Sequence, residues 1–354
     1  MVRWRRGVVE AVRSARPGVV ELDVAVSETL VRALAYTDLV GSPVPGDPVL
    51  LNVNALEGGL GTGGYALVVA LPERLPPDAP PPGHLVKARY TPLQAMVAGA
   101  DEPGGVHHAL LAEADDLDGL PVVAADLHSA LAPIALAIAA DRPGTRVVYA
   151  MTDGAALPAA FSRSVAELRS AGLLHGCVTT GQSFGGDLEC VSLHTGLLAA
   201  RLVLDAEVVV VAQGPGNLGS DTRWGFSGVS AGEAINAAAV LGGRPIGALR
   251  VSGADPRERH RGLSHHSRTA YGRVALAPAR LPVPAISDPF WTPVRAAAAA
   301  LCPPHEVVEV DPAGLPETWT RTDVGLSSMG RGPAQDGAYF LAAAVAGRLA
   351  TAGL

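Results

Sequence analysis

Cysteine is scarce in this sequence. Its 354 residues include only Cys177, Cys190 and Cys302, and no two of them have the Cys-x-x-Cys spacing. An odd number of cysteines without that spacing argues against a disulfide framework and against a zinc knuckle. Isolated cysteines are typical of a reducing compartment, so we expect a cytoplasmic protein.

Aromatic and charged residues are also few. Aromatic residues make up 4% of the chain and charged residues 17%, and the formal net charge is −7. Proteins that bind nucleic acids need a basic surface for the phosphates and, for single strands, aromatic rings on which bases stack. We therefore expect no nucleic-acid partner. A small-molecule ligand is the expected partner, and self-association to a homo-oligomer stays open.

Long apolar runs are missing. A membrane-spanning helix needs about 20 apolar residues, and the longest candidate, residues 127–140, contains His128 and Pro133. The arginine-rich start at residues 3–6 is not followed by the apolar segment of a signal peptide. We predict neither a membrane span nor a signal peptide.

Glycine and proline, in contrast, are abundant, with 41 and 29 residues. Prolines crowd residues 72–83, and a proline-rich segment favours a stiff, extended connector. We therefore predict a small domain at residues 1–71 and a large one at residues 84–354.

The first of these domains has the pattern of short strands. Runs rich in valine and leucine, separated by turn residues, occupy residues 7–12, 19–24, 30–36, 48–53 and 65–71. Short strands at this spacing are typical of a small barrel or sandwich. We predict an all-β, barrel-like domain.

The second domain alternates between two patterns. Continuous apolar runs at residues 121–125, 146–151, 176–180, 207–212 and 245–251 are separated by helical segments, among them residues 188–204. This alternation predicts an α/β fold, a mostly parallel sheet covered by helices. Residues 272–277 and 306–310 are weaker candidate strands.

Polar side chains follow each of these strands. In open α/β sheets, ligands bind outside the carboxyl ends of the strands, so we expect these side chains to share one edge. The candidates are Asp126, His128, Asp153, Ser183, Asp187, Gly214, Gly216, Gly219, Arg223, His265 and His266.

One motif in this set matches a nucleophile elbow. Gly181-x-Ser183-x-Gly185 has the pattern in which a serine stands exposed on a strained turn between a strand and a helix. His265 or His266 would be the base, and Asp221 or Asp255 the acid. The alternative is a tight turn without chemistry, because glycine is common enough here to produce the pattern by chance.

A second motif matches the dinucleotide fingerprint. Gly214-x-Gly216-x-x-Gly219 follows the clearest strand, but a polar loop takes the place of the helix whose N-terminus holds the pyrophosphate. We expect the amides of this loop, together with Arg223, to hold a simpler anion such as a phosphate or carboxylate.

Oxygen and imidazole ligands could also hold a divalent metal. Asp126, His128 and Asp187 are the predicted ligands, with Asp153, His265 and His266 within reach of the same edge. The alternative is that these loop residues only form hydrogen bonds.

Five short segments together resemble a known family. They are Gly-His-Leu-Val-Lys at 83–87, Arg-Tyr-Thr-Pro-Leu-Gln at 89–94, Gly-Gly-Asp-Leu-Glu at 185–189, Trp-Gly-Phe-Ser-Gly at 224–228 and Ser-His-His at 264–266. The chain resembles, over nearly its whole length, an uncharacterised bacterial family catalogued as a domain of unknown function, DUF3866. The resemblance implies no activity, ligand or catalytic residue.

From the residues we expect an enzyme, or a former enzyme, acting on a small polar or anionic metabolite at the carboxyl edge of the sheet. His265 or His266 would act as acid or base, and Asp126, Asp153 or Asp187 would orient it or bind a metal. The alternative is a non-catalytic binding or scaffold protein in which the β domain mediates assembly.

Overall fold

The computed structural model describes residues 1–61 and 63–354. The chain divides into two compact units, Met1–Val97 and Ala98–Leu354. The segment expected to be a connector, residues 72–83, contains no helix or strand. Among the described residues, no helix combines the length and the apolar character that crossing a bilayer requires.

The N-terminal unit contains a closed five-stranded barrel, as predicted. Its strands, in spatial order, are β1 (Trp4–Arg16), β2 (Val19–Val26), β3 (Thr29–Tyr36), β5 (Ala66–Ala70) and β4 (Pro48–Asn52). Alternate residues of β2, including Leu22 and Val24, fill the barrel. Gly7 is required on β1 because a Cβ there would lie 2.6 Å from Val24 Cγ1.

Short elements complete this unit. They are helices α1 (Thr37–Val40) and α2 (Asn54–Glu57) and the antiparallel ribbon of β6 (Leu85–Lys87) and β7 (Ala95–Val97).

The second unit is built on an eight-stranded sheet in which all neighbouring strands are parallel. In spatial order these strands are β11 (Leu188–Cys190), β10 (Gly176–Thr180), β9 (Val147–Thr152), β12 (Val208–Gln213), β8 (Pro121–Ala124), β13 (Arg244–Gly247), β16 (Arg280–Pro284) and β17 (Glu306–Val310). The predicted α/β class is confirmed.

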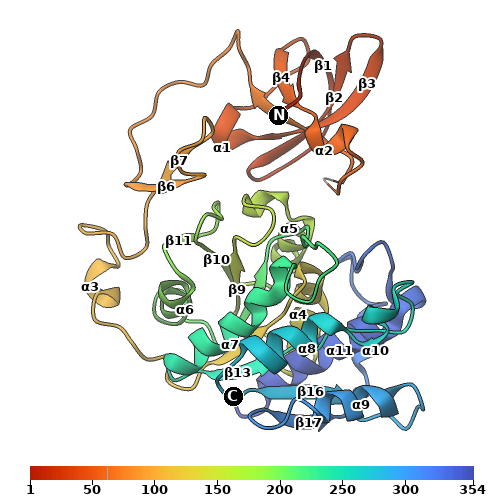
Figure 1. Cartoon of the computed structure of the whole chain (residues 1–354). Coiled ribbons are helices and arrows are strands. Elements are labelled where there is room, and N and C mark those ends of the chain that lie inside the picture. The colour runs from red at the N-terminus through yellow and green to blue at the C-terminus, as the bar shows by residue number, and fades with distance from the viewer. Residues whose placement is uncertain (62) are drawn as a thin grey trace. The chain divides into compact units, whose positions relative to one another are not determined.

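Helices cover both faces of the sheet (Figure 1). Val122 and Val209 pack on one side with α6 (Leu193–Leu202) and α7 (Ser230–Val240). Their neighbours Val123 and Val210 pack on the other side with α4 (Leu131–Asp141), α5 (Arg163–Ser170) and α11 (Pro333–Thr351). Successive side chains of a strand point to opposite faces, so a strand buried on both faces is a continuous apolar run.

Two predicted elements were wrong. The helix expected at residues 188–204 begins only at Leu193, because residues 188–190 pair with β10 as the edge strand β11. The strand expected at 272–277 is instead the turn Ala270–Val274, which continues the short helix α8 (His265–Thr269). Within residues 272–277 only Ala275 is buried, and Leu276 is exposed, so this apolar run does not have the burial of a strand in the sheet.

Several elements were not foreseen, among them β16, α9 (Trp291–Ala299) and α10 (Leu315–Thr318). Strand β16 carries Pro282 and Pro284, and proline within a run argues against a strand. Helices α9 and α10 flank β17.

The strand order has a switch point at the centre of the sheet. From β8 the chain passes beyond β12 to β9, whereas from β12 it passes beyond β8 to β13. The two connections leave the neighbouring strands β8 and β12 in opposite directions. In open α/β sheets, such a switch point is where ligands bind, outside the carboxyl ends of the strands.

Candidate active site

Segments that follow two strands of this switch point line one cavity. Its volume is about 200 Å³, and the loop after β12 contributes Gly219 to it. Arg250 follows β13, and Asp126 follows β8 directly behind the cavity wall. The lining includes Arg250, Arg257, Arg259, His260, His265 and His266.

A buried triad of charged and aromatic groups forms the floor. Nδ1 of His266 lies 3.2 Å from Asp126 Oδ2 and 2.9 Å from Arg250 Nη1. Asp126 and Arg250 are 5% and 4% exposed, and their charged atoms are 3.5 Å apart. Burial alone would raise the pKa of Asp126, but the hydrogen bond with His266 and the charge of Arg250 hold it below its usual value. Asp126 is therefore ionised at neutral pH.

A second buried carboxylate continues this network. Asp255 accepts two hydrogen bonds of 2.9 Å from the guanidinium of Arg257 and one of 3.3 Å from Arg331. Burial raises the pKa of Asp255, but the hydrogen bonds and charge of Arg257 outweigh it and hold that pKa well below the usual range. The ion pairs of this carboxylate hold in place the loop that follows β14 (Val251–Ser252) and leads to the rim of the cavity.

The network ends at a break in helix α11. Asp336 has non-helical backbone angles, which turn its carboxylate toward Ser252. One carboxylate oxygen accepts from the Ser252 hydroxyl at 2.5 Å, and the other accepts from Gly253 N at 3.0 Å. Arg331 donates to Asp336 at 3.3 Å and so joins the two carboxylates into one network.

Three imidazole rings stand over this network. His260 ends the 3₁₀ turn Glu258–His260, and His265 and His266 open α8, whose N-cap is Ser264. The ring centroids lie between 4.4 and 4.9 Å apart. Phe226 stacks on His266 with a centroid distance of 3.7 Å and nearly parallel planes, which fixes the orientation of that ring.

The chemical state of two of these rings follows from their surroundings. Burial, followed by the nearby guanidinium groups of Arg259 and Arg250, lowers the pKa of His265 to about 4. Burial and then Arg250 and Arg257 lower the pKa of His260 to about 3. Both rings are therefore neutral at pH 7. Nε2 of His265 is buried and has no hydrogen-bond partner among the described residues.

A family model matches residues 32–347, from β3 of the barrel into α11. Its description is "Protein of unknown function (DUF3866)". This chain belongs to the DUF3866 family. No curated protein matches the sequence significantly. The matched range contains every residue of the cavity and of the network behind it, so these side chains lie within the DUF3866 part of the chain.

Among the predicted site residues of this DUF3866 protein, the fold brings together His265, His266, Asp126 and Gly219. It does not bring Asp153, Asp187 or Arg223 to the cavity. Asp153 accepts from Gln182 N at 2.8 Å. Asp187 is paired with Arg169 and accepts from Cys177 N at 2.8 Å.

Ser183 lies in a setting that does not suit a nucleophile. It is fully buried, and its hydroxyl lies 2.8 Å from Met151 O and 2.7 Å from Thr180 O. The helix that a nucleophile elbow requires is absent here, because the strand β11 follows. We therefore do not include Ser183 in the proposed function.

Both ring nitrogens of His128 form hydrogen bonds within the fold. Its Nδ1 lies 3.0 Å from Tyr149 Oη, and its Nε2 lies 2.7 Å from Ser162 Oγ. Burial lowers its pKa to about 4. Both ring nitrogens are occupied, so His128 has no nitrogen left for a metal.

The glycine loop after β12 serves packing more than ligand binding. A Cβ at Gly214 would lie 2.4 Å from Ala156 O, so this glycine is needed for close backbone approach. Gly216 has a φ of +98°, which favours glycine, and Arg223 is exposed. No helix follows at once: the 3₁₀ turn Ser227–Val229 and α7 come only after the loop.

Sequence reasoning missed part of the site. It did not select His260, Arg250, Arg331 or Asp336. The density of arginine and histidine over residues 257–266 is the signal that points to His260. Nothing in the sequence marks Asp336, which reaches the site through the break in α11.

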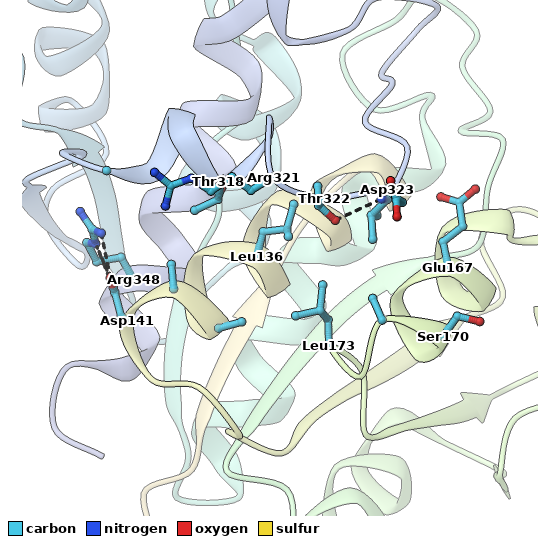
Figure 2. A pocket seen from close by; sticks show the side chains of 15 residues that line it. Leu136, Asp141, Glu167, Ser170, Leu173, Thr318, Arg321, Thr322, Asp323 and Arg348 are labelled. Atoms are coloured by element: carbon cyan, nitrogen blue, oxygen red, sulfur yellow. Dashed lines mark hydrogen bonds and ion pairs between the residues drawn. The ribbon is translucent and has the colours of Figure 1, made fainter.

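A larger cavity of about 830 Å³ lies elsewhere, beside the C-terminal ends of α4 and α5 (Figure 2). Asp141 and Arg348 at its edge form an ion pair at 2.8 Å, and Glu167 accepts from Gly325 N at 2.9 Å. Its described lining includes neither histidine nor cysteine. We therefore place the candidate site at the smaller cavity, where reactive side chains converge.

Proposed function

We propose that this protein is an enzyme that binds a small anionic metabolite in the arginine–histidine cavity and acts on it there. The observation that carries the proposal is the convergence of three arginines and three histidines on one cavity at the switch point of the sheet.

The cavity supports a ligand that is both small and negatively charged. Sites for drug-sized molecules usually measure about 300–1,000 Å³, and this one measures about 200 Å³. Arg257 and Arg259 are the more accessible arginines, with side chains 38% and 35% exposed, and they are paired with Asp255 and Asp221, whereas Arg250 is buried. Planar guanidinium groups bind phosphate and carboxylate with two parallel hydrogen bonds.

The histidines supply the reactive nitrogens. Neutral imidazoles in the cavity lining offer nitrogen lone pairs to a bound molecule or ion, and His260 and His265 are two such rings. Asp126 has a positioning role, because its carboxylate holds His266 from behind the cavity.

The proposal is tested by anion binding to the full-length protein after treatment with EDTA. Inorganic phosphate, pyrophosphate, a sugar phosphate and a dicarboxylate are titrated at constant ionic strength by calorimetry, and we expect at least one to bind saturably. A charge-assisted hydrogen bond contributes about 1.5–3 kcal/mol, so Arg259→Gln should weaken that affinity at least tenfold.

The matched control is Arg142→Gln. Arg142 is also a half-exposed arginine paired with a carboxylate, Glu207, but it lies outside the cavity lining. Its substitution should leave the affinity unchanged. The proposal is overturned if none of the anions binds, or if the two variants weaken binding equally.

A further inference from the structure

The three histidines of the cavity have the spacing of metal ligands. Their candidate ligand atoms all lie within 4.8 Å of one another. In residues 1–61 and 63–354, this is the one group of three histidine, cysteine, aspartate or glutamate side chains found at that spacing. Four-coordinate zinc holds neighbouring nitrogens about 3.4 Å apart, so the rings would draw closer on binding.

Hydrogen bonds at Nδ1 of two rings leave their Nε2 atoms as the candidate ligand atoms. Nδ1 of His266 lies 3.2 Å from the Asp126 carboxylate, and Nδ1 of His260 lies 2.8 Å from Ser264 Oγ. Histidines that bind a metal through Nε2 usually donate their Nδ1 proton in this way. The Nε2 atoms of both rings form no hydrogen bond within the described residues.

Arg250 also approaches Nδ1 of His266, at 2.9 Å. A guanidinium can only donate, so a bond from Arg250 would need the proton of His266 on Nε2. Metal binding at Nε2 selects the other tautomer, in which Nδ1–H donates to Asp126. The buried Asp126 carboxylate is therefore the group that prepares His266 as a ligand.

The third ring has an unsatisfied nitrogen. Nε2 of His265 is buried without a hydrogen-bond partner in the described part of the chain. Leaving a buried polar atom unpaired costs about 1–3 kcal/mol, and a bound metal would satisfy it.

The charges behind the rings permit a cation. The network and the cavity lining beside it contain four guanidinium groups and four carboxylates, which balance: Arg250, Arg257, Arg259, Arg331, Asp126, Asp221, Asp255 and Asp336. A divalent ion would therefore not face a net positive charge from these groups, and it would add to the attraction of the cavity for an anion.

We propose that His260, His265 and His266 form a binding site for a divalent transition metal, with zinc as the expected ion. Three imidazoles that leave a fourth position open are typical of catalytic rather than structural zinc. The inference rests on the proposed function in one respect, because the open position faces the metabolite cavity. There the metal would hold a water molecule or an oxygen of the anion.

The test uses full-length protein without a histidine tag. After removal of metal with EDTA, the protein is titrated with Co²⁺, whose visible absorption reports its ligands, and then with Zn²⁺ as competitor. We expect one Co²⁺ per chain, with bands of nitrogen and oxygen ligation that Zn²⁺ removes. His260→Gln and His265→Gln should each weaken the affinity more than tenfold, and Asp126→Asn should weaken it about 10- to 100-fold.

The control variant is His175→Gln, because His175 is exposed and lies outside the cavity lining. It should bind Co²⁺ as the unaltered protein does. His265 is only partly buried, so its variant is the one expected to keep the fold, which near-ultraviolet circular dichroism verifies. The inference is overturned if the unaltered protein binds no Co²⁺ at micromolar concentration or if both histidine variants bind it normally. The inference is also overturned if the Co²⁺ absorption bands disappear in the variant Cys302→Ser and not in the histidine variants.

The two proposals fail separately. Anion binding is measured on metal-free protein and depends on Arg259, whereas Co²⁺ binding is measured without anion and depends on the histidines. Absence of Co²⁺ binding with intact phosphate binding removes the metal and leaves the proposed function. The opposite result removes the anion site and leaves the metal.

Discussion

The carboxylate of Asp126 lies 3.2 Å from Nδ1 of His266, although 140 positions separate the two residues in the sequence. Asp126 follows the central strand β8, and His266 lies in α8, whose N-cap is Ser264. Their contact joins the exit of β8 to the histidine cluster, and it makes the cavity one site rather than two neighbouring loops.

This contact predicts a large cost for Asp126→Asn. Loss of the carboxylate leaves Arg250 with less compensation in the interior, and breaking a buried ion pair usually costs about 3–5 kcal/mol. We expect a loss of that order in the free energy of unfolding, measured with urea. Asp118→Asn removes an exposed partner of Arg201 and should cost less than about 1 kcal/mol. Equal losses in the two variants would contradict the role of Asp126.

The buried environment of His128 predicts a dependence of stability on pH. Its pKa is about 4 in the folded protein, against about 6.5 in an unfolded chain. Between these values the unfolded state binds the additional proton, so stability falls as the pH is lowered from about 6.5 to about 4. The variant His128→Gln should show a shallower decline in melting temperature over this range. His175→Gln, at an exposed position, should keep the original slope; an unchanged slope in the His128 variant would contradict the prediction.

The position of Ser183 predicts that the protein is not a serine hydrolase of the elbow type. A fluorophosphonate probe should give no adduct on the folded protein under conditions in which a known serine hydrolase reacts. Ser183→Ala should instead reduce stability by about 1–3 kcal/mol, because the buried carbonyls of Met151 and Thr180 lose a donor. Mass-spectrometric detection of an adduct at Ser183 would refute this prediction.

The glycines after β12 predict a contrast between two alanine substitutions. At Gly214 a Cβ would lie 2.4 Å from Ala156 O, so Gly214→Ala should cost about 1–3 kcal/mol of stability. At Gly219 the nearest atom is 3.8 Å away, so Gly219→Ala should change stability by no more than about 0.5 kcal/mol. Melting temperatures of the two variants test this, and similar values would contradict it.

Much of the fold could be predicted from local patterns. The apolar run at residues 207–212 indicated the central strand β12, and the short valine-rich runs before residue 72 indicated the barrel. The prediction of secondary structure failed where the local sequence favours one structure and the tertiary contacts favour another. The prolines of β16 argue against a strand, yet parallel pairing with β17 keeps that segment in the sheet.

The candidate site was predictable only in part. Polar residues at strand exits directed attention to Asp126, His265 and His266, which the structure does bring together, since parallel strands end at one edge. The same reasoning placed Asp153 and Asp187 with them, but the sheet separates these residues from the cavity. Strand order decides which exits are neighbours, and a single sequence does not reveal that order.

By itself, the sequence determined the class of the protein: an N-terminal β barrel, an α/β unit with a parallel sheet, and polar strand exits rich in glycine. These properties depend on the periodicity of apolar residues, which is local. Only the tertiary structure decided that His260 joins His265 and His266 and that Asp126, Arg250 and Asp336 support them. Those contacts depend on which strand lies beside which and on one break in a helix, and both result from packing of the whole chain.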